Sequence, residues 1–242
     1  ALVHLGAEAV KLGKTVIHYS LEMADTSIAG RYDSCITGVK LKDMFHFKEQ
    51  IYDKVKDIEG NVIIKEYPTK TATTTTIKNH LERIKSRGID IDMIIVDYAD
   101  LLKPVTTRRT SEKRHDLESI YEELRGLSQV FECPIWTASQ TNRSGLNAEV
   151  ITMEAISEAF NKCFVADFIF TISRTKEDKI ANKGTLFVAK NRNGPDGLVF
   201  PIKMDTSNVK IKVLPMGIAG NTVAPTVKTQ SESLREKYKK LK

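Results

Sequence analysis

The sequence has few cysteines and no long apolar run, and both shortages exclude classes of protein. Its three cysteines, Cys35, Cys133 and Cys163, lie far apart and form no CxxC pair. An odd number without a spacing pattern argues against a disulfide framework and a zinc site, and it favours reduced thiols in a cytosolic protein. The longest apolar stretches, 91–96 and 164–172, have the length of strands, whereas a membrane-spanning helix needs about 20 apolar residues. We therefore expect neither a membrane protein nor a disulfide-stabilised one.

A large excess of charge of one sign is also lacking. The 37 lysines and arginines exceed the 31 aspartates and glutamates enough for a formal net charge of +6 and a pI of about 9.1. Much of this excess lies at the C-terminal end, in Arg235, Lys237, Lys239, Lys240 and Lys242. A basic tail is more often a solvated chain end than a nucleic-acid contact, so charge alone favours a polyanionic partner only weakly.

The 242 residues suit one large domain in which strand and helix patterns alternate at first and strands follow one another later. The early strands are expected over 15–20, 62–67, 92–97 and 134–139, with helices between them over 25–36, 45–58, 75–87 and 115–131. Later strands are expected over 168–173, 185–191, 199–204 and 210–214, with short glycine-containing connections that allow hairpins. We predict an α/β fold with a mostly parallel central sheet flanked by helices, and with antiparallel C-terminal strands. This domain would span 1–215, and 216–242 would form a linker and a basic tail.

Polar residues follow four of the apolar strands. They are SLEM at 20–23, Asp97-Tyr98, SQTNR at 139–143 and KNRNG at 190–194. Parallel sheets bind ligands at the carboxyl ends of their strands. The residue types suit phosphoryl transfer, which needs a carboxylate for the metal, a group that orients water, a sensor amide and cations for the developing charge.

Each of these residues also has a simpler interpretation. Asp97 ends the apolar run MIIV as a Walker B aspartate does, but any buried strand can end in a capping acid. Glu22 could act as a general base, or it could be an acid favoured by a helix N-terminus. Gln140 could sense a γ-phosphate or be a surface amide. Lys190 and Arg192 alternate on one strand and so face the same side, as a phosphate reader or as a solvated basic edge.

Taken together, the motifs identify a family. The order SLEM, MIIVDYADLL, CPIWTASQTNRSG, ISEAF, VADFIF and AKNRNGPDG resembles the RecA-like C-terminal ATPase domain of DnaB-type hexameric replicative DNA helicases, including phage members. The likeness runs from 1 to 213, and its specificity lies in the order and spacing of the motifs. The resemblance implies that Glu22 is the catalytic glutamate, Asp97 the Walker B aspartate that holds the metal, and Gln140 the sensor. It also implies that Lys190 and Arg192 reach the ATP of the neighbouring subunit, with Arg192 as the arginine finger.

Further expectations follow from the resemblance alone. ATP and Mg²⁺ are the implied cofactors, and Ser20 and Arg143 join the implied nucleotide-binding residues. The implied assembly is a hexameric ring that moves 5′ to 3′ on single-stranded DNA, with a primase and a helicase loader as candidate partners. The implied location is the cytoplasm of a bacterial cell or of a phage-infected host, with no membrane partner.

Two loops are implied to line the channel for DNA. The first, 105–114, carries Arg108, Arg109, Lys113 and Arg114. In the second, 144–160, Glu158 aligns with the acid of the family's R-E-S-G segment. The sequence departs from that segment, because Ser157 stands where many bacterial members have arginine and Phe160 replaces the glycine. Which residue of this loop would hold the DNA phosphates therefore stays open, with Ser157 as one candidate.

The largest departure is the lack of a GxxxxGK[ST] phosphate loop. Gly13-Lys14-Thr15 lacks the first glycine and opens a strand, so its amides cannot form an anion site at a helix N-terminus. In the family this loop directly precedes the helix expected over 1–12. We therefore expect that the chain is truncated after its phosphate loop and binds ATP poorly as printed.

Two alternatives remain at this point. One is a related recombinase or circadian-clock-type ATPase, which assembly into filaments would support. The other is a non-catalytic domain that has lost its phosphate loop and binds DNA or a ring. The presence of Glu22, Asp97, Gln140 and Arg192 together argues against such decay.

Overall fold

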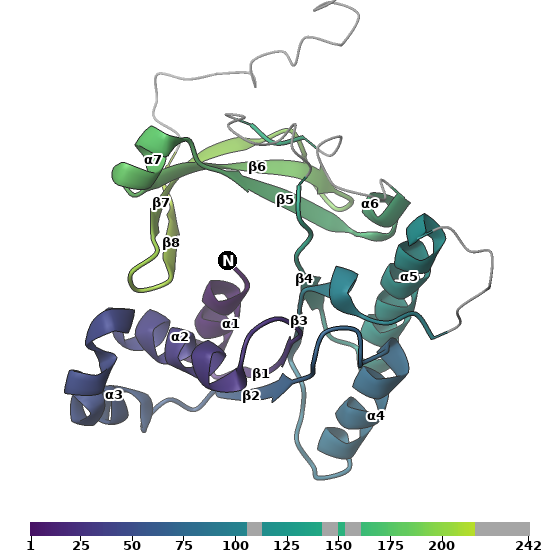
Figure 1. Ribbon diagram of the computed structural model, residues 1–242, viewed down its shortest axis with the longest axis horizontal. Helices are drawn as coiled ribbons and strands as arrows, with labels where there is room; N and C mark the ends of the chain where they lie inside the picture. The colour runs from purple at the N-terminus through teal and green to yellow at the C-terminus, as the bar shows by residue number, and fades with distance from the viewer. Residues whose placement is uncertain (106–112, 142–149, 153–160, 216–242) are drawn as a thin grey trace, which may run out of the picture.

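The computed structural model describes residues 1–105, 113–141, 150–152 and 161–215, and within them it contains two four-stranded sheets (Figure 1). The first sheet is parallel, in the order β2-β1-β3-β4, and is built from β1 (Thr15–Ser20), β2 (Asn61–Glu66), β3 (Met93–Asp97) and β4 (Ile135–Thr137). The second is antiparallel, in the order β5-β6-β7-β8, and consists of β5 (Phe168–Ser173), β6 (Lys183–Asn191), β7 (Val199–Asp205) and β8 (Lys210–Val213).

Helices connect the parallel strands, and short helices precede and follow β5. The α-helices are α1 (Leu2–Lys11), α2 (Asp25–Thr37), α3 (Lys48–Val55), α4 (Thr74–Lys85), α5 (Lys113–Phe131), α6 (Asn161–Val165) and α7 (Lys176–Ile180). Two 3-10 helices, η1 (Leu41–Phe47) and η2 (Ala99–Leu101), complete the set. Among the described residues, no helix has both the length and the apolar character needed to cross a membrane.

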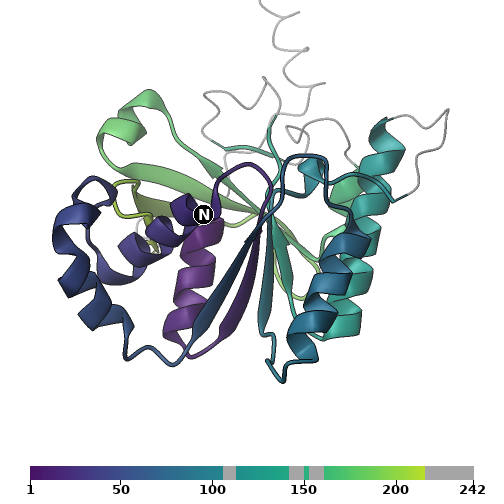
Figure 2. The same ribbon diagram turned by 60° about the horizontal axis from the view of Figure 1, so that its bottom comes forward.

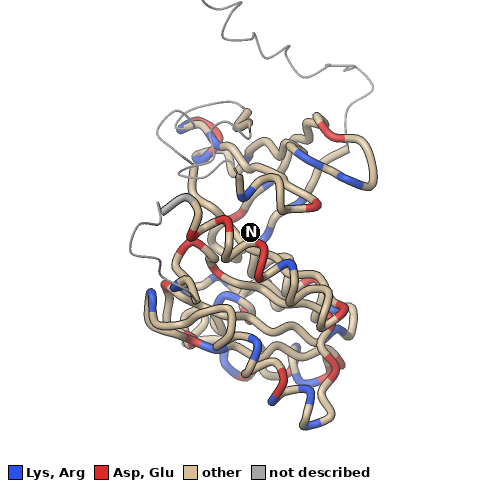
Figure 3. The backbone as a smooth tube through the Cα atoms, turned by 90° about the vertical axis from the view of Figure 1, so that its right-hand side faces the viewer, with Lys and Arg blue, Asp and Glu red and all other residues tan. Residues whose placement is uncertain are grey.

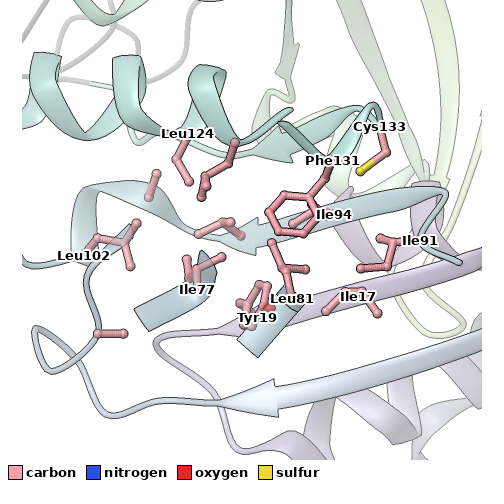
Figure 4. Packing of buried hydrophobic residues seen from close by; sticks show 14 of the residues in the cluster. Ile17, Tyr19, Ile77, Leu81, Ile91, Ile94, Leu102, Leu124, Phe131 and Cys133 are labelled. Atoms are coloured by element: carbon pink, nitrogen blue, oxygen red, sulfur yellow. The ribbon is translucent and has the colours of Figure 1, made fainter. Parts of the chain in front are cut away.

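Helices cover both faces of the parallel sheet (Figure 2). Ile17 and Tyr19 of β1 pack with side chains of α4 and α5 in one core cluster, which Figure 4 shows from close by. Val16 of β1 and Ile95 of β3 belong instead to a cluster with residues of α1. This alternation follows from the two-residue period of a strand. It explains why β3 is a nearly continuous apolar run, since both faces of this strand are buried.

The antiparallel sheet is held to the rest of the domain by side chains. The ring of Trp136 in β4 packs against Phe168 and Phe170 of β5, with ring centroids 6.1 and 6.0 Å apart. In the turn between β7 and β8, the Val209 carbonyl oxygen accepts a hydrogen bond of 3.5 Å from Cys35 Sγ of α2. Aromatic packing and this contact with α2 therefore join the antiparallel sheet to the rest of the domain. Within the described ranges, no strand of one sheet pairs with a strand of the other.

The structure confirms the predicted α/β class, with a parallel sheet flanked by helices and antiparallel C-terminal strands. Two local expectations are wrong. The helix expected over 45–58 is η1 followed by α3, which begins at Lys48. The strand expected over 134–139 ends at Thr137, whose hydroxyl accepts from the Ala99 N–H and donates to the Val96 carbonyl. The division expected at residue 215 stays a prediction, because 216–242 lie outside the described residues.

Candidate functional site at the carboxyl edge of the parallel sheet

The predicted acids lie at the ends of two paired strands. Ser20 of β1 is in register with Asp97 of β3, and the Leu21 N–H donates to the Asp97 carbonyl at 3.0 Å. The buried Ser20 hydroxyl donates to the Met23 carbonyl at 2.6 Å and accepts from the Met23 N–H at 3.2 Å. Ser20 therefore shapes the turn that leaves the Glu22 side chain exposed at this edge.

Tyr98 lies beside three of the predicted catalytic residues, Glu22, Asp97 and Gln140. Gln140 Nε2 donates a hydrogen bond of 3.0 Å to the Tyr98 hydroxyl. Partial burial, and then the charges of Glu22, Asp100 and Asp97, raise the pKa of the Tyr98 phenol. Glu22, Asp97 and Gln140 thus act on one side chain, although they come from three segments of the chain. Sequence reasoning missed the part of Tyr98, whose only sequence signal is its place directly after Asp97.

Asp97 has the position and the chemistry of a magnesium ligand. Its side chain is 29% exposed, and His18 Nε2 lies 3.9 Å from Asp97 Oδ2. Carboxylate oxygens that remain open to solvent suit Mg²⁺, which keeps several of its waters. The residue thus fits the metal-holding role predicted for it. The peptide bond from Asp97 to Tyr98 is cis.

His18 is a buried neighbour of Asp97 that the sequence analysis did not single out. Its side chain is fully buried, and Nδ1 shares a hydrogen bond of 2.9 Å with the Tyr32 hydroxyl of α2. Nε2 has no hydrogen-bond partner among the residues that the structure describes, and it faces the Asp97 carboxylate. The Tyr32 hydroxyl reaches His18 across α1, where Gly6 offers no side chain. A glycine at this position is therefore a packing requirement of the site.

We expect Gly6→Ala to lower the Tm, because the new methyl group would overlap the Tyr32 hydroxyl and meet Ile95 Cδ1 at 3.0 Å. Overpacking of a core costs about 1–3 kcal/mol, and each kcal/mol shifts the Tm of a domain of this size by roughly 2–4 °C. The matched control is Gly126→Ala in α5, where a methyl group meets nothing within 4 Å. That control should raise the Tm slightly, since alanine favours a helix by about 1 kcal/mol over glycine. Calorimetry that gives both variants the same Tm shift would contradict this packing account.

Lys190 near the end of β6 and Arg192 in the turn just after that strand share one acceptor. The Phe164 carbonyl oxygen accepts from Lys190 Nζ at 3.0 Å and from Arg192 Nη2 at 2.8 Å. Arg192 Nη1 also lies 3.0 Å from Asp167 Oδ1. Burial, and then the charge of Arg192, lower the pKa of the Lys190 ammonium. The two side chains therefore face the same side, as the alternation on the strand predicts.

Neither cation contacts the two predicted catalytic acids of its own chain, although Arg192 pairs with Asp167. Among the described residues, no hydrogen bond or ion pair links Lys190 or Arg192 to Glu22 or Asp97. Arg192 is 42% exposed. A side chain so placed is accessible to a group outside its own chain.

The other predicted site residues cannot be placed. Lys113 and Arg114 open α5, but the structure describes only their backbone. The residues that lie outside the described ranges are Arg108, Arg109, Arg143, Ser157 and Glu158.

A buried charged network that sequence reasoning missed lies beside the site. Lys162 of α6 is 2% exposed, and its Nζ lies 2.8 Å from Asp100 Oδ2 in η2. The same Nζ donates to the Ser139 hydroxyl at 2.6 Å. Asp100 follows Asp97 closely and Ser139 precedes Gln140, so the network supports the strand ends that carry the predicted metal ligand and sensor.

A second place where a metal ion could bind lies away from the strand ends. His4, Glu8 and Cys35 bring three ligand atoms within 4.8 Å of one another. Glu8, however, is paired with Lys11 at 2.5 Å, and burial raises the pKa of the Cys35 thiol. A raised pKa opposes the thiolate that metal binding needs. The prediction that the cysteines form no zinc site therefore stays the simpler interpretation.

Comparison with known proteins assigns the chain to a family. The model of the family described as the DnaB-like helicase C terminal domain matches residues 2–208. The chain belongs to this family. A DnaB-like replicative helicase of Enterobacteria phage T4 is 30% identical over 203 residues, which are 80% of this chain and 43% of that protein. The replicative DNA helicase DnaB of Mycoplasma genitalium is 23% identical over 210 residues, 80% of this chain and 44% of that protein.

Solved structures support the same fold for this member of the DnaB-like family. One solved structure, described as an ATPase domain, superposes with a TM-score of 0.72 and 15% identity, over 88% of this chain and 80% of that one. A DnaB-like replicative helicase described with its interactions with primase gives the same TM-score and identity, over 88% of this chain and 56% of that one. The chain spans less than half the length of the curated relatives it matches. The resemblance and the RecA-like fold expected from the motifs are confirmed.

Proposed function

We propose that this DnaB-like domain is the ATP-driven motor of a replicative DNA helicase, which hydrolyses ATP between subunits and moves 5′ to 3′ on single-stranded DNA. One observation carries the proposal. At one edge of the parallel sheet, Gln140 donates to the hydroxyl of Tyr98, which directly follows Asp97, and the charge of Glu22 acts on the same hydroxyl. Arg192 lies just after β6 of the other sheet, and among the described residues no hydrogen bond or ion pair links it to Glu22, Asp97 or Gln140. A hydrolytic site split in this way is complete only when a second subunit supplies the arginine.

Each residue then has a defined part in the reaction. Asp97 would hold Mg²⁺, which would supply charge stabilisation to the phosphates, and Glu22 accepts a proton from the attacking water. Gln140 donates to an oxygen of the γ-phosphate and follows it when it leaves. The partner subunit's copies of Lys190 and Arg192 stabilise the charge that develops on the transferred phosphoryl group.

The phosphate-binding loop of this site would lead into α1. Helix α1 packs against the parallel sheet, where its Leu2 shares a core cluster with Ile95 of β3. The free amides at the start of a helix favour an anion. We propose that residues ahead of α1 supply the loop, and the gene sequence upstream of Ala1 decides this point.

The expectations about DNA and protein partners belong to the same proposal. A ring would pass single-stranded DNA through its channel, where basic and small polar loops hold the backbone without reading bases. Acidic and basic positions are interspersed along the described chain (Figure 3), so a DNA grip would depend on local loops such as 105–114. A primase partner has support from a structural relative described with its primase interactions.

The experiment that tests the function is unwinding by the full-length protein. Two duplexes are compared, one with a single-stranded arm at the 5′ end only and one with such an arm at the 3′ end only. We expect ATP-dependent unwinding of the duplex with the 5′ arm and none of the duplex with the 3′ arm. A protein that hydrolyses ATP and forms filaments without unwinding would favour the recombinase or clock-type ATPase. A protein that binds DNA or a ring but hydrolyses no ATP would favour the non-catalytic domain.

A further inference from the structure

Lys162 of α6 is bound to the segments that follow β3 and β4, which carry two of the predicted catalytic residues, Asp97 and Gln140. Its Nζ donates to Asp100 Oδ2 at 2.8 Å and to Ser139 Oγ at 2.6 Å. Asp100 lies in η2, directly after the β3 end that carries Asp97, and Ser139 directly precedes Gln140. A buried ammonium is very unfavourable unless it is paired and hydrogen-bonded, so these two acceptors fix its position firmly.

A third segment closes this network. The Tyr121 hydroxyl of α5 donates to Asp100 Oδ1 at 2.8 Å, and Ser139 Oγ donates to Asp100 Oδ2 at 3.1 Å. Lys162 Nζ also lies 5.7 Å from the centroid of the Tyr121 ring, within the range of a cation–π contact. The loop after β3, the end of β4 and helix α5 are therefore tied to a single side chain of α6.

The carbonyl end of α6 is held by the predicted finger residues. Lys190 Nζ donates to the Cys163 carbonyl at 2.8 Å and to the Phe164 carbonyl at 3.0 Å, and Arg192 Nη2 donates to the Phe164 carbonyl at 2.8 Å. Cys163 is the next residue after Lys162. Helix α6 thus contacts Asp100 and Ser139 through the Lys162 side chain, and it contacts Lys190 and Arg192 through its backbone carbonyls.

We propose that Lys162 is a positioning residue that couples the ATP site of its own subunit to the cations that the same subunit presents to its neighbour. This inference rests on the proposed function, since it needs Lys190 and Arg192 to act in trans. When the γ-phosphate leaves, Gln140 moves, and Ser139 moves with it. Lys162 transmits this shift to α6, and the carbonyls that hold Lys190 and Arg192 shift in turn. Because a coupling between two sites is reciprocal, binding at the neighbouring site also acts back on this one.

The simpler role for the network is to hold the fold, and two variants of the full-length protein separate the two roles. Lys162→Met together with Asp100→Asn removes both charges at once and leaves no unpaired charge buried, so its Tm should stay near that of the wild type. Ser139→Ala keeps the pair of Lys162 and Asp100 but cuts its link to the sensor strand. The control is Lys78→Met, which removes a surface pair with Glu82 on α4.

The readout is the dependence of hydrolysis on ATP concentration, together with the Tm. Wild type and Lys78→Met should show a Hill coefficient above 1, whereas the double variant and Ser139→Ala should fall to about 1 while still binding a fluorescent ATP analogue. A Hill coefficient as high as that of the wild type in either folded variant would overturn the coupling role of Lys162. A wild type that hydrolyses ATP with a Hill coefficient of about 1 would overturn it as well. If the double variant does not fold, Ser139→Ala decides alone. A wild type that hydrolyses no ATP would instead contradict the proposed function, so the two failures are distinguishable.

Discussion

Arg192→Ala should lower DNA-stimulated ATP hydrolysis by about 10³-fold or more, the scale of a lost arginine finger. Nucleotide binding and ring assembly should persist, because the local structure has a second support. Arg125 Nη2 also holds Asp167 Oδ1, at 2.9 Å, so the acid that Arg192 contacts keeps a partner in the variant. Steady-state hydrolysis with and without single-stranded DNA, beside a binding titration, measures the effect.

The matched control is Arg174→Ala. Arg174 also belongs to the antiparallel region, and its Nε donates to the Lys183 carbonyl at 2.9 Å. Its loss should leave hydrolysis within about twofold of the wild type, because a surface contact of this kind is weak. Equal losses in the two variants would show that any change in this sheet harms the protein, and the finger role would have no support.

Glu22→Gln should lower hydrolysis by two or more orders of magnitude, which is the usual effect of losing a positioned base. The amide has the shape of the carboxylate and the side chain is exposed, so folding and ATP binding should stay nearly intact. Glu66→Gln is the matched control, since Glu66 ends the neighbouring strand β2 in register with Ser20. That variant should hydrolyse ATP at close to the wild-type rate.

Asp97→Asn separates the two acids. Loss of this carboxylate should weaken nucleotide binding that depends on Mg²⁺, whereas Glu22→Gln should not. Titrating ATP at several Mg²⁺ concentrations distinguishes a binding defect from a chemical one. Equal effects of both substitutions on binding would undo the assignment of metal ligand to Asp97 and base to Glu22.

The parts of this domain that can be predicted from sequence depend on local patterns. The continuous apolar run before Asp97 indicates a buried parallel strand, and the carboxyl ends of such strands meet at one edge. Glu22, Asp97 and Gln140 could therefore be placed together without coordinates. The alternation of Lys190 and Arg192 predicts a common face in the same way, and both do contact the Phe164 carbonyl.

The parts that could not be predicted depend on contacts between distant residues. Lys162 and Asp100 are 62 positions apart, and a lysine is expected at the surface unless a partner is known. Helix α6, which carries Lys162, has five residues and so too few turns for an apolar period. His18 reaches Tyr32 only because Gly6 lacks a side chain, a relation between three elements that no pattern within one of them encodes.

The measurement that tests the shared site most directly mixes the two inactive variants in one ring. An interface that takes Glu22 from an Arg192→Ala subunit and Arg192 from a Glu22→Gln subunit is complete, whereas each variant alone has none. Single-turnover hydrolysis avoids the need for every site to act, since one complete interface can release one phosphate. Phosphate release should rise and then fall as the fraction of Glu22→Gln subunits in the mixture increases from zero to one. No release at any ratio, in rings shown to contain both variants, would contradict a site shared between subunits.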